Sequence, residues 1–472
     1  MSVAGTQRYF LQVLGCPKNQ VDGGYLDGLL EGAGYRQAAS AEEADVCVVH
    51  TCGFIEVAAQ ESVDTLLELA ALKRRNPQMR LVASGCLAQR HGEALAEALP
   101  EVDIVVGTRD WPQLPRILAR PGRAVRVGEL SPIDYSRLPF RPTAPATTYL
   151  KLSDGCNFRC AFCTIPSFTG DLRSKPVEVV VAEAAQALRT GVLELVLVAQ
   201  DLTGYGRDLR PRRSSLAELL RRLAALRPQP QWIRLMYATL EGVDAELIET
   251  IASLDCVAKY LDMPLQHVHP ATLRRMKRPY SADRALHTLA ALREAMPDLA
   301  LRSTFVVGFP GETDEEFQYL LDFLPAAQLD WVTAFAYSEE AGTTAAAMPD
   351  QVAPQVRRRR RRAVYAAQAP VSRARNRRLI GRRLTVLGEA IAPAPHGDGQ
   401  VLVARSQREA PEVDGRVLVR GLDDCGAMLD RMLDVEVVGA ATYQVTAMAV
   451  DVESTAPRRR TLQMLPVAVA TR

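Results

Sequence analysis

Three cysteines stand within eight residues of one another, at Cys156, Cys160 and Cys163, in the spacing C-x3-C-x2-C. No fourth cysteine and no histidine lies close to them in the sequence. A structural zinc site needs four protein ligands, usually as C-x2-C pairs, so three thiolates fit zinc poorly. Iron–sulfur clusters also bind thiolates and normally take four of them. A four-iron cluster held by these three would keep one iron open to a reactant. Three buried structural cysteines are the weaker alternative, because free cysteines rarely cluster without a ligand.

A second set of three cysteines is spread over the first 110 residues. Short apolar segments at 9–14, 46–50, 80–84 and 103–106 alternate with helical patterns at 21–32, 55–75 and 89–99, which predicts a flavodoxin-like parallel sheet. Cys16, Cys52 and Cys86 each follow one of these strands, and a glycine adjoins each cysteine. The carboxyl ends of parallel strands share one edge, so we expect these thiols to converge in a second site that again lacks a fourth ligand.

The other three cysteines show no such pattern. Cys47 lies inside the apolar run 46–49 and is expected in the core, while Cys256 and Cys425 are isolated and are expected to be structural. The total of nine is odd, and the first ten residues contain no apolar signal segment. These features favour a cytoplasmic protein with reduced thiols over a disulfide framework.

The elements that position the Cys156–Cys163 loop form a second α/β unit. Strands are predicted at 149–152, 193–199, 232–236, 259–262, 301–307 and 331–336, with helices at 177–189, 216–226, 244–252 and 281–295. Six such units predict a partial (βα)6 barrel, and the cysteine loop follows its first strand. It therefore lies at the mouth where barrel active sites are found. Thr313 and Glu316 predict a capping box after the fifth strand.

The totals agree with a globular chain of several domains. The 472 residues suggest about three domains, which we place at 7–122, 142–378 and 379–448. Hydrophobic residues make up 48% and charged residues 24%, and no segment has the roughly 18 consecutive apolar residues of a membrane span. The formal net charge of +2 does not decide whether the chain binds nucleic acid.

A basic run joins the second and third domains. Arg357 to Arg383 includes twelve arginines and no acidic residue. Such a run either contacts phosphate, for example in ribosomal RNA, or forms a solvated amphipathic helix, and the sequence does not separate the two.

The last domain is predicted to be a small barrel of the OB or TRAM type, with strands at 384–387, 399–403, 415–419 and 432–438. Binders of single-stranded nucleic acid usually present aromatic side chains on a basic groove. Between 384 and 445 the only aromatic residue is Tyr443, and ten acidic residues outnumber five arginines. This charge favours a basic protein partner over RNA. The tail beyond residue 451 is expected to be a poorly ordered extension.

The cysteine spacing at 156–163 resembles that of the radical S-adenosylmethionine (SAM) enzymes, and the whole chain resembles the methylthiotransferase family among them. The strings that carry this resemblance are 14–19 (LGCPKN), 50–55 (HTCGFI), 198–201 (VAQD), 264–267 (PLQH) and 410–415 (APEVDG). They are similar to the RimO branch, which modifies a ribosomal protein. One departure is 235–240 (LMYATL), where the family pattern has a proline near its end.

The resemblance implies two [4Fe-4S] clusters, one on Cys16, Cys52 and Cys86 and one on Cys156, Cys160 and Cys163. The second cluster would bind SAM and cleave it. Asp201, with Gln200, occupies the position that contacts the amino group of SAM in the superfamily. His267 would either face the substrate or hydrogen-bond within its loop, and we favour the loop.

The resemblance also implies the reaction. A deoxyadenosyl radical would remove hydrogen from the β-carbon of an aspartate in small-subunit ribosomal protein twelve, and a methylthio group would then be added. The partners would be that protein, possibly on the ribosome, with a reductant and a sulfur donor. The alternative is a tRNA adenosine methylthiotransferase of the MiaB branch, which uses the same cofactors. A non-catalytic iron–sulfur or zinc protein that binds ribosomes is a third possibility.

Overall fold

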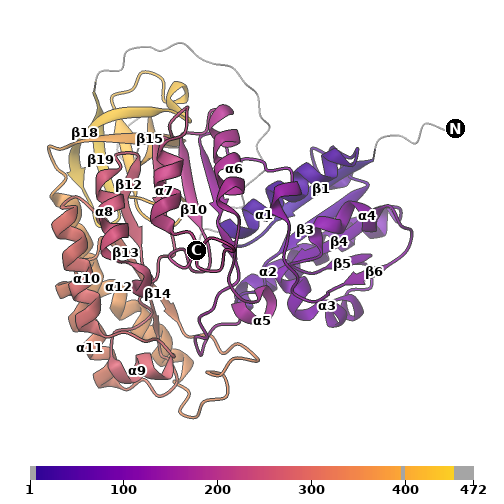
Figure 1. Cartoon of the computed structure of the whole chain (residues 1–472), viewed down its shortest axis with the longest axis horizontal. Helices are drawn as coiled ribbons and strands as arrows, with labels where there is room; N and C mark the ends of the chain where they lie inside the picture. Colours follow the sequence, from indigo (N-terminus) through magenta and orange to yellow (C-terminus); the bar gives the residue numbers. More distant parts are fainter. Residues whose placement is uncertain (1–6, 395–398, 451–472) are drawn as a thin grey trace.

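The computed structural model describes residues 7–394 and 399–450, and its first domain is a parallel α/β sheet (Figure 1). The strand order is β2-β1-β3-β4-β5-β6, which confirms the predicted flavodoxin-like parallel sheet. Four helices cover the sheet. The bounds are β1 (Arg8–Val13), α1 (Pro17–Gly32), β2 (Arg36–Gln37), β3 (Val46–Thr51), α2 (Glu56–Arg75), β4 (Arg80–Gly85), α3 (Cys86–Ala98), β5 (Ile104–Val106), α4 (Leu114–Leu118) and β6 (Ala124–Arg126).

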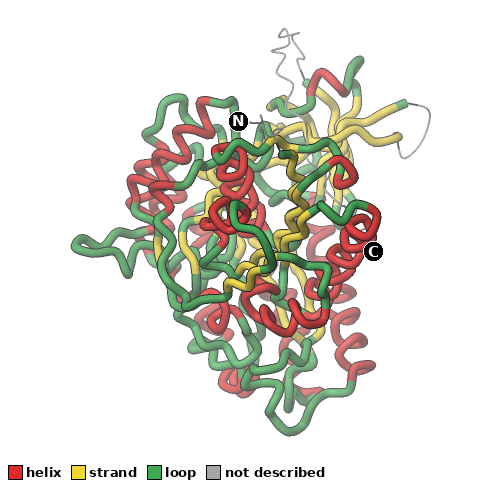
Figure 2. The backbone as a smooth tube through the Cα atoms, turned by 90° about the vertical axis from the view of Figure 1, so that its right-hand side faces the viewer, coloured by secondary structure: helices red, strands yellow, loops and turns green. Residues whose placement is uncertain are grey.

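The second domain is a six-stranded parallel sheet in the order β14-β13-β12-β11-β10-β7, which confirms the predicted partial barrel. Its strands run through the middle of the molecule with helices outside them (Figure 2). The strands are β7 (Thr147–Lys151), β10 (Glu194–Val198), β11 (Trp232–Leu235), β12 (Val257–Asp262), β13 (Ala300–Val307) and β14 (Trp331–Ala336). The helices are α5 (Ile165–Thr169), α6 (Val177–Arg189), α7 (Leu216–Ala224), α8 (Ala245–Ser253), α9 (Pro270–Arg275), α10 (Ala282–Ala295) and α11 (Asp314–Ala327), and a short hairpin pairs β8 (Ser153–Asp154) with β9 (Arg173–Ser174).

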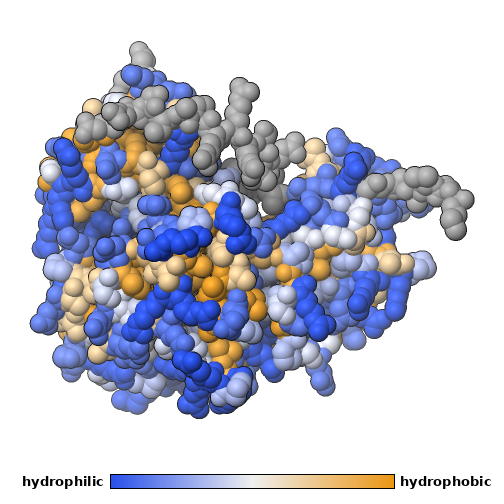
Figure 3. Space-filling view, turned by 45° about the horizontal axis from the view of Figure 1, so that its top comes forward, coloured by the Kyte–Doolittle hydropathy of each residue, from blue (hydrophilic) through white to orange (hydrophobic). Residues whose placement is uncertain are grey.

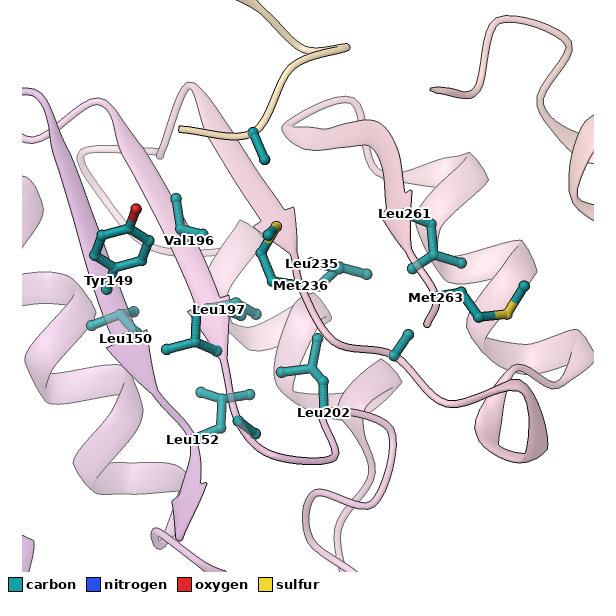
Figure 4. Close-up of a cluster of buried hydrophobic side chains, with 14 of the residues drawn as sticks. Tyr149, Leu150, Leu152, Val196, Leu197, Leu202, Leu235, Met236, Leu261 and Met263 are labelled. Carbon is teal, nitrogen blue, oxygen red and sulfur yellow. The ribbon is translucent and has the colours of Figure 1, made fainter. Parts of the chain in front are cut away.

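Local sequence explains these elements. Strand β10 is buried along its whole length, as expected for a parallel strand covered on both faces. Side chains from β7, β10, β11 and β12 pack together in the core (Figure 4). Ser215, Ser281 and Thr313 cap α7, α10 and α11, and the predicted capping box of Thr313 and Glu316 is present.

The third domain is a closed five-stranded barrel in the order β15-β16-β17-β19-β18, as predicted. Four of its strands match the predicted ranges, and the sequence predicts no range for β19. The predicted extension beyond residue 451 lies outside the described residues. The strands are β15 (Arg383–Pro393), β16 (Gln400–Ser406), β17 (Arg416–Arg420), β18 (Met432–Ala440) and β19 (Gln444–Ala449).

The basic run forms helix α12 (Pro354–Arg377), and it is only partly solvated. Arg357, Arg360 and Arg375 are buried. Arg360 pairs with Glu312 at 2.9 Å and Arg375 with Asp330 at 2.8 Å, so these arginines fix the helix to the barrel. Exposed arginines remain on the opposite face, namely Arg358, Arg359, Arg361, Arg362, Arg373 and Arg377.

The third domain closes the end of the barrel where its strands begin. Glu194, the first residue of β10, receives hydrogen bonds from Arg234 at 2.7 Å and from Arg405 of the third domain at 2.5 Å. Asp414 accepts from Arg302 at 3.1 Å and from Tyr260 at 2.7 Å. The cysteine loop lies at the other end of the strands, away from the third domain.

Polar side chains cover most of the surface in Figure 3, with apolar residues gathered near the centre of the view. Within the described ranges, no helix is both long enough and apolar enough to cross a membrane.

Candidate active site

The loop after β7 brings Cys156, Cys160 and Cys163 together. The Cys163 amide donates to the Cys160 carbonyl at 3.1 Å, and the Cys156 amide donates to the carbonyl of Gly170. Gly155 has φ of +67° and lies so close to the backbone of Asp171 that a side chain has no room. Burial, with a smaller contribution from neighbouring thiols, raises the pKa of Cys156 to about 11 and that of Cys163 to about 12. A metal must therefore displace protons to bind here.

The second triplet also converges, at the carboxyl edge of the first sheet. Cys16 precedes α1, Cys52 follows β3, and Cys86 begins α3. A β-carbon added at Gly15 would lie 2.7 Å from Cys52 Sγ, so the Cys16 and Cys52 loops touch. Burial raises the pKa of Cys52 to about 11, and the charge of Cys16 adds to this shift. The pKa of Cys86 is also raised, by burial and then by Cys16 and Cys52.

Asn19 joins the three loops of this triplet. Its side-chain amide donates to the Leu14 carbonyl at 2.9 Å and to the Thr51 carbonyl at 3.0 Å. Its Oδ1 lies 3.8 Å from Cys86 Sγ. Asn19 belongs to the string LGCPKN, but its role as a tie was not predicted.

The chemistry of both triplets fits iron–sulfur clusters. Each offers three thiols and no fourth protein ligand, a poor set for zinc and an unsuitable one for Mg²⁺ or Ca²⁺. In the part of the chain that the structure describes, no three His, Cys, Asp or Glu side chains approach closely enough for a single metal ion. Gly15, Gly85 and Gly155, which have positive φ, allow a close approach of the backbone to a bulky group.

The two cysteine-bearing edges lie against each other. Thr164 Oγ1, just after Cys163, donates to the carbonyl of Phe54 at 3.3 Å. Glu340, after β14, accepts from the Glu56 amide at 3.0 Å and pairs with Arg90 at 3.1 Å. The two cysteine-bearing edges therefore face each other across the domain interface.

Lys18 and Tyr237 contact each other between the two cysteine-bearing edges. Lys18 Nζ lies 4.0 Å from the centroid of the Tyr237 ring at the end of β11. Tyr237 has φ of +65°, the left-handed region that residues other than glycine rarely adopt. Its amide donates to Asp262 Oδ2 at 3.1 Å, and Arg302 donates to Asp262 Oδ1 at 2.8 Å. Tyr237 lies in the segment 235–240, where the sequence departs from the family pattern.

Asp201 lies near the cluster loop, and its charge contributes to the raised pKa of Cys156 after burial. Its Oδ1 accepts from Thr203 Oγ1 and the Gly204 amide at 3.1 Å and from Thr239 Oγ1 at 3.2 Å. Oδ1 of Asp201 therefore fixes the loop that follows β10. The contact of Asp201 and Gln200 with SAM stays a prediction.

His267 lies in the interior, and its Nε2 has no hydrogen-bond partner among the described residues. The side chain is 0% exposed, and its Nδ1 accepts from the His269 amide at 3.0 Å. Burial lowers the pKa of His267 to about 3, so the ring is neutral and its proton is on Nε2. The hypothesis of a hydrogen bond within the loop is confirmed. Cys47 is likewise in the core, as predicted, and Cys256 and Cys425 are buried.

Three polar residues beside the cluster loop were not predicted. Arg278 Nη1 lies 3.5 Å from Cys160 Sγ, and its guanidinium stacks on Phe158 and Tyr280. Among the described residues, Arg278 Nε, Tyr280 Oη and both carboxylate oxygens of Glu241 are buried without a hydrogen-bond partner. Buried polar groups without a hydrogen-bond partner are rare in native proteins. No motif points to them, because their convergence is set by the fold.

A surface hollow of about 410 Å³ lies beside this group. Arg274, Arg278 and Arg284 line it, together with Ser281 at the start of α10. The lining of the hollow is therefore basic, and one of its lining residues, Arg278, contacts Cys160.

A six-stranded parallel partial barrel whose first strand leads into a C-x3-C-x2-C loop defines a radical SAM enzyme. Comparison with known families agrees with this class. Residues 150–324 match the radical SAM superfamily, residues 8–107 match the uncharacterized protein family UPF0004, and residues 380–450 match the TRAM domain.

Relatives cover nearly the whole chain. A protein of Chloroflexus aurantiacus named ribosomal protein uS12 methylthiotransferase RimO is 48% identical over 93% of this chain and 98% of its own length. Proteins of the same name from Roseiflexus castenholzii and Geobacter sulfurreducens are 45% and 44% identical, over 92% and 86% of this chain and 94% and 91% of their own lengths. The chain belongs to the RimO family of ribosomal protein uS12 methylthiotransferases.

Solved structures confirm the fold at lower similarity. The radical SAM methyltransferase TsrM from Kitasatospora setae, with cobalamin and a [4Fe-4S] cluster bound, has a TM-score of 0.54 at 15% identity, over 70% of this chain and 75% of TsrM. The cobalamin-dependent SAM radical enzyme OxsB has a TM-score of 0.50 at 13% identity, over 72% of this chain and 54% of OxsB.

Proposed function

We propose that this enzyme adds a methylthio group to the β-carbon of an aspartate in ribosomal protein uS12. The observation that carries the proposal is the pair of three-thiol sites on facing edges of two sheets, in a chain of the RimO family. The alternative substrate, a tRNA adenosine, is not favoured, because relatives over almost the full length bear the name uS12 methylthiotransferase.

Membership of the radical SAM superfamily implies one [4Fe-4S] cluster and SAM. We assign that cluster to Cys156, Cys160 and Cys163, and we propose a second cluster on Cys16, Cys52 and Cys86. When bound, the cluster on Cys156, Cys160 and Cys163 would supply the electron that cleaves SAM and yields a deoxyadenosyl radical. A radical is needed because an unactivated C–H bond offers no proton to a general base.

The protein groups around the cluster loop complete the proposed SAM site. The guanidinium of Arg278 suits a carboxylate, and the carboxylate of Glu241 suits an ammonium or hydroxyl group. Both are buried with unmet hydrogen-bonding capacity, so a polar ligand that joins them removes an energetic penalty. Asp201, with Gln200, stays a candidate to bind the amino group of SAM. Asp201 would do so through Oδ2, because Oδ1 already accepts the hydrogen bonds of its own loop.

The charge of the third domain supports a basic protein as substrate. Its buried charges cancel, since Arg405 and Arg408 are buried along with Glu409 and the side chain of Asp414. The acidic excess is therefore on the surface, at Asp423, Asp424, Asp430, Asp434 and Glu436. An acidic surface attracts a basic ribosomal protein and repels phosphate.

The remaining partners belong to the proposal as well. The exposed arginines of α12 are available to ribosomal RNA if uS12 is met on the ribosome, and a ribosomal substrate implies a cytoplasmic location. A reductant and a sulfur donor are also required by the reaction.

The test is direct. The anaerobically reconstituted protein is incubated with reductant, sulfide and SAM labelled in its methyl group, and is offered either a peptide of the uS12 target loop or tRNA. We expect label in the peptide, on the aspartate, by mass spectrometry. Label in tRNA alone contradicts the proposal.

A further inference from the structure

Lys18 joins the two cysteine sites. It lies in the first turn of α1, two residues after Cys16, and its ammonium reaches across the interface to the Tyr237 ring at the barrel mouth, 4.0 Å from the centroid. It is half-buried, so its charge is partly withdrawn from water. Helix α1 lies at the boundary between the first domain and the barrel (Figure 1).

The other lysines of this interface have carboxylate partners, and Lys18 has none. Lys151 pairs with Asp22 and with Asp154, the latter at 2.9 Å, and Lys175 pairs with Glu183 at 2.9 Å. In the described part of the chain, no carboxylate oxygen forms an ion pair with Lys18. Asp262, a carboxylate whose charge acts on Lys18, is already bonded to Arg302 and to the Tyr237 amide.

The backbone of Tyr237, whose ring contacts Lys18, is strained. Tyr237 keeps φ of +65° although it is not glycine, and its amide is fixed by Asp262. Strained backbone of this kind persists where the surroundings hold it for a function. Here it places an aromatic face under the ammonium, which orients the cation without neutralising it.

We propose that Lys18 binds the carboxylate of the target aspartate and thereby presents the β-carbon between the two cysteine sites. The inference rests on the proposed function and names the group that recognises its substrate. The carboxylate carbon of aspartate is bonded directly to the β-carbon, so a contact with the carboxylate fixes the reacting atom one bond away. A charge-assisted hydrogen bond in a partly dry site is strong enough to select the charged side chain over its amide.

Lys18 has one competing role, as a counter-charge for the thiolates of Cys16 and Cys86. That role predicts lower iron content in a Lys18 variant and no effect on the choice between substrates. The two roles are therefore separated by a binding measurement that needs no turnover.

The experiment measures anaerobic binding of two fluorescent peptides of the uS12 target loop, one with the native aspartate and one with asparagine, to the reconstituted full chain. We expect wild type to bind the aspartate peptide at least about tenfold more tightly, and K18M to bind both as weakly as wild type binds the asparagine peptide. K18R keeps part of the preference. The matched control is K73M, because Lys73 is on the same domain but pairs with Asp103 at the start of β5, away from the cysteine edge. Thermal melts and iron content establish that each variant is folded and loaded.

The outcomes separate the two proposals. If wild type discriminates and K18M discriminates equally, the assignment of Lys18 is wrong and the proposed function stands. A loss of iron in K18M with an unchanged preference for aspartate also overturns the assignment, in favour of the counter-charge role. If wild type binds both peptides equally or neither, the aspartate substrate and the assignment fail together.

Discussion

Arg405 of the third domain donates to Glu194 of the barrel at 2.5 Å, and neither side chain is more than 2% exposed. Arg234 donates to the same carboxylate from the neighbouring strand. One buried anion therefore holds two guanidinium groups from two domains, which makes the small barrel a fixed part of the enzyme.

Replacing Glu194 by glutamine is expected to destabilise the chain strongly. Loss of the shared anion removes the carboxylate partner of Arg234 and leaves Arg405 with Glu389 as its ion-pair partner, and breaking a buried pair of this kind costs about 3–5 kcal/mol. Chemical denaturation measures the loss. The control is E178Q, whose exposed pair with Arg222 contributes little. Equal effects of the two substitutions contradict the structural role of Glu194.

Acid should weaken the same contact. Burial alone would raise the pKa of Glu194, but Arg405 and Arg234 outweigh it and lower the pKa to about 2. A lowered pKa gives stability that is present above the unfolded value near 4 and is lost as pH falls toward 2. Wild type should therefore lose more stability than E194Q between pH 4 and pH 2, as judged by urea midpoints.

Asp414 should show the opposite pH dependence. Burial raises its pKa to about 6, although Arg302 opposes the shift. The folded state then binds the proton of Asp414 more tightly than the unfolded state does. The free energy of unfolding therefore increases as pH falls through 6, and this stabilisation is lost as pH rises through 6. In melting temperatures measured at pH 4 and pH 7, wild type should gain stability on acidification relative to D414N. A difference that is independent of pH contradicts the shift.

The division of labour between the cysteine sites is tested with C52A. We expect iron to fall from about eight to about four per chain, SAM cleavage to continue, and methylthio transfer to cease. The control is C47A, since Cys47 is a fully buried core residue. Simultaneous loss of SAM cleavage in C52A contradicts separate roles.

Arg278 should tune the cluster beside it. Its guanidinium contacts Cys160 Sγ at 3.5 Å, and hydrogen bonds to cluster sulfurs are among the factors that set reduction potential. R278M is expected to make the potential more negative in a redox titration followed by electron paramagnetic resonance. R274M, on the rim of the same hollow, should leave it unchanged.

The sequence was most informative where period and spacing carry the signal. The six barrel strands and the flavodoxin-like parallel sheet follow from apolar runs of four to eight residues, and both cysteine sets follow from the positions of the cysteines after four of these strands. Strands β2 and β6 have two and three residues, too few to show a period. Arg360 and Glu312 are 48 residues apart, and nothing local distinguishes this buried arginine from its exposed neighbours. Glu241, Arg278 and Tyr280 were missed for the same reason, because only the tertiary structure brings them together.

The hydrophobic core has a consequence for how the molecule unfolds. Tyr25, Leu26 and Trp111 of the first domain belong to the same buried cluster as Tyr149, Val180 and Leu195 of the barrel. Lys175 stabilises this contact, because it donates to Tyr25 Oη at 2.6 Å and also pairs with Glu183. The first two sheets therefore share one cooperative unit, and a fragment that ends between them exposes apolar surface and separates Lys175 from Tyr25. The two α/β sheets are separate in topology, but we expect them to unfold in a single calorimetric transition.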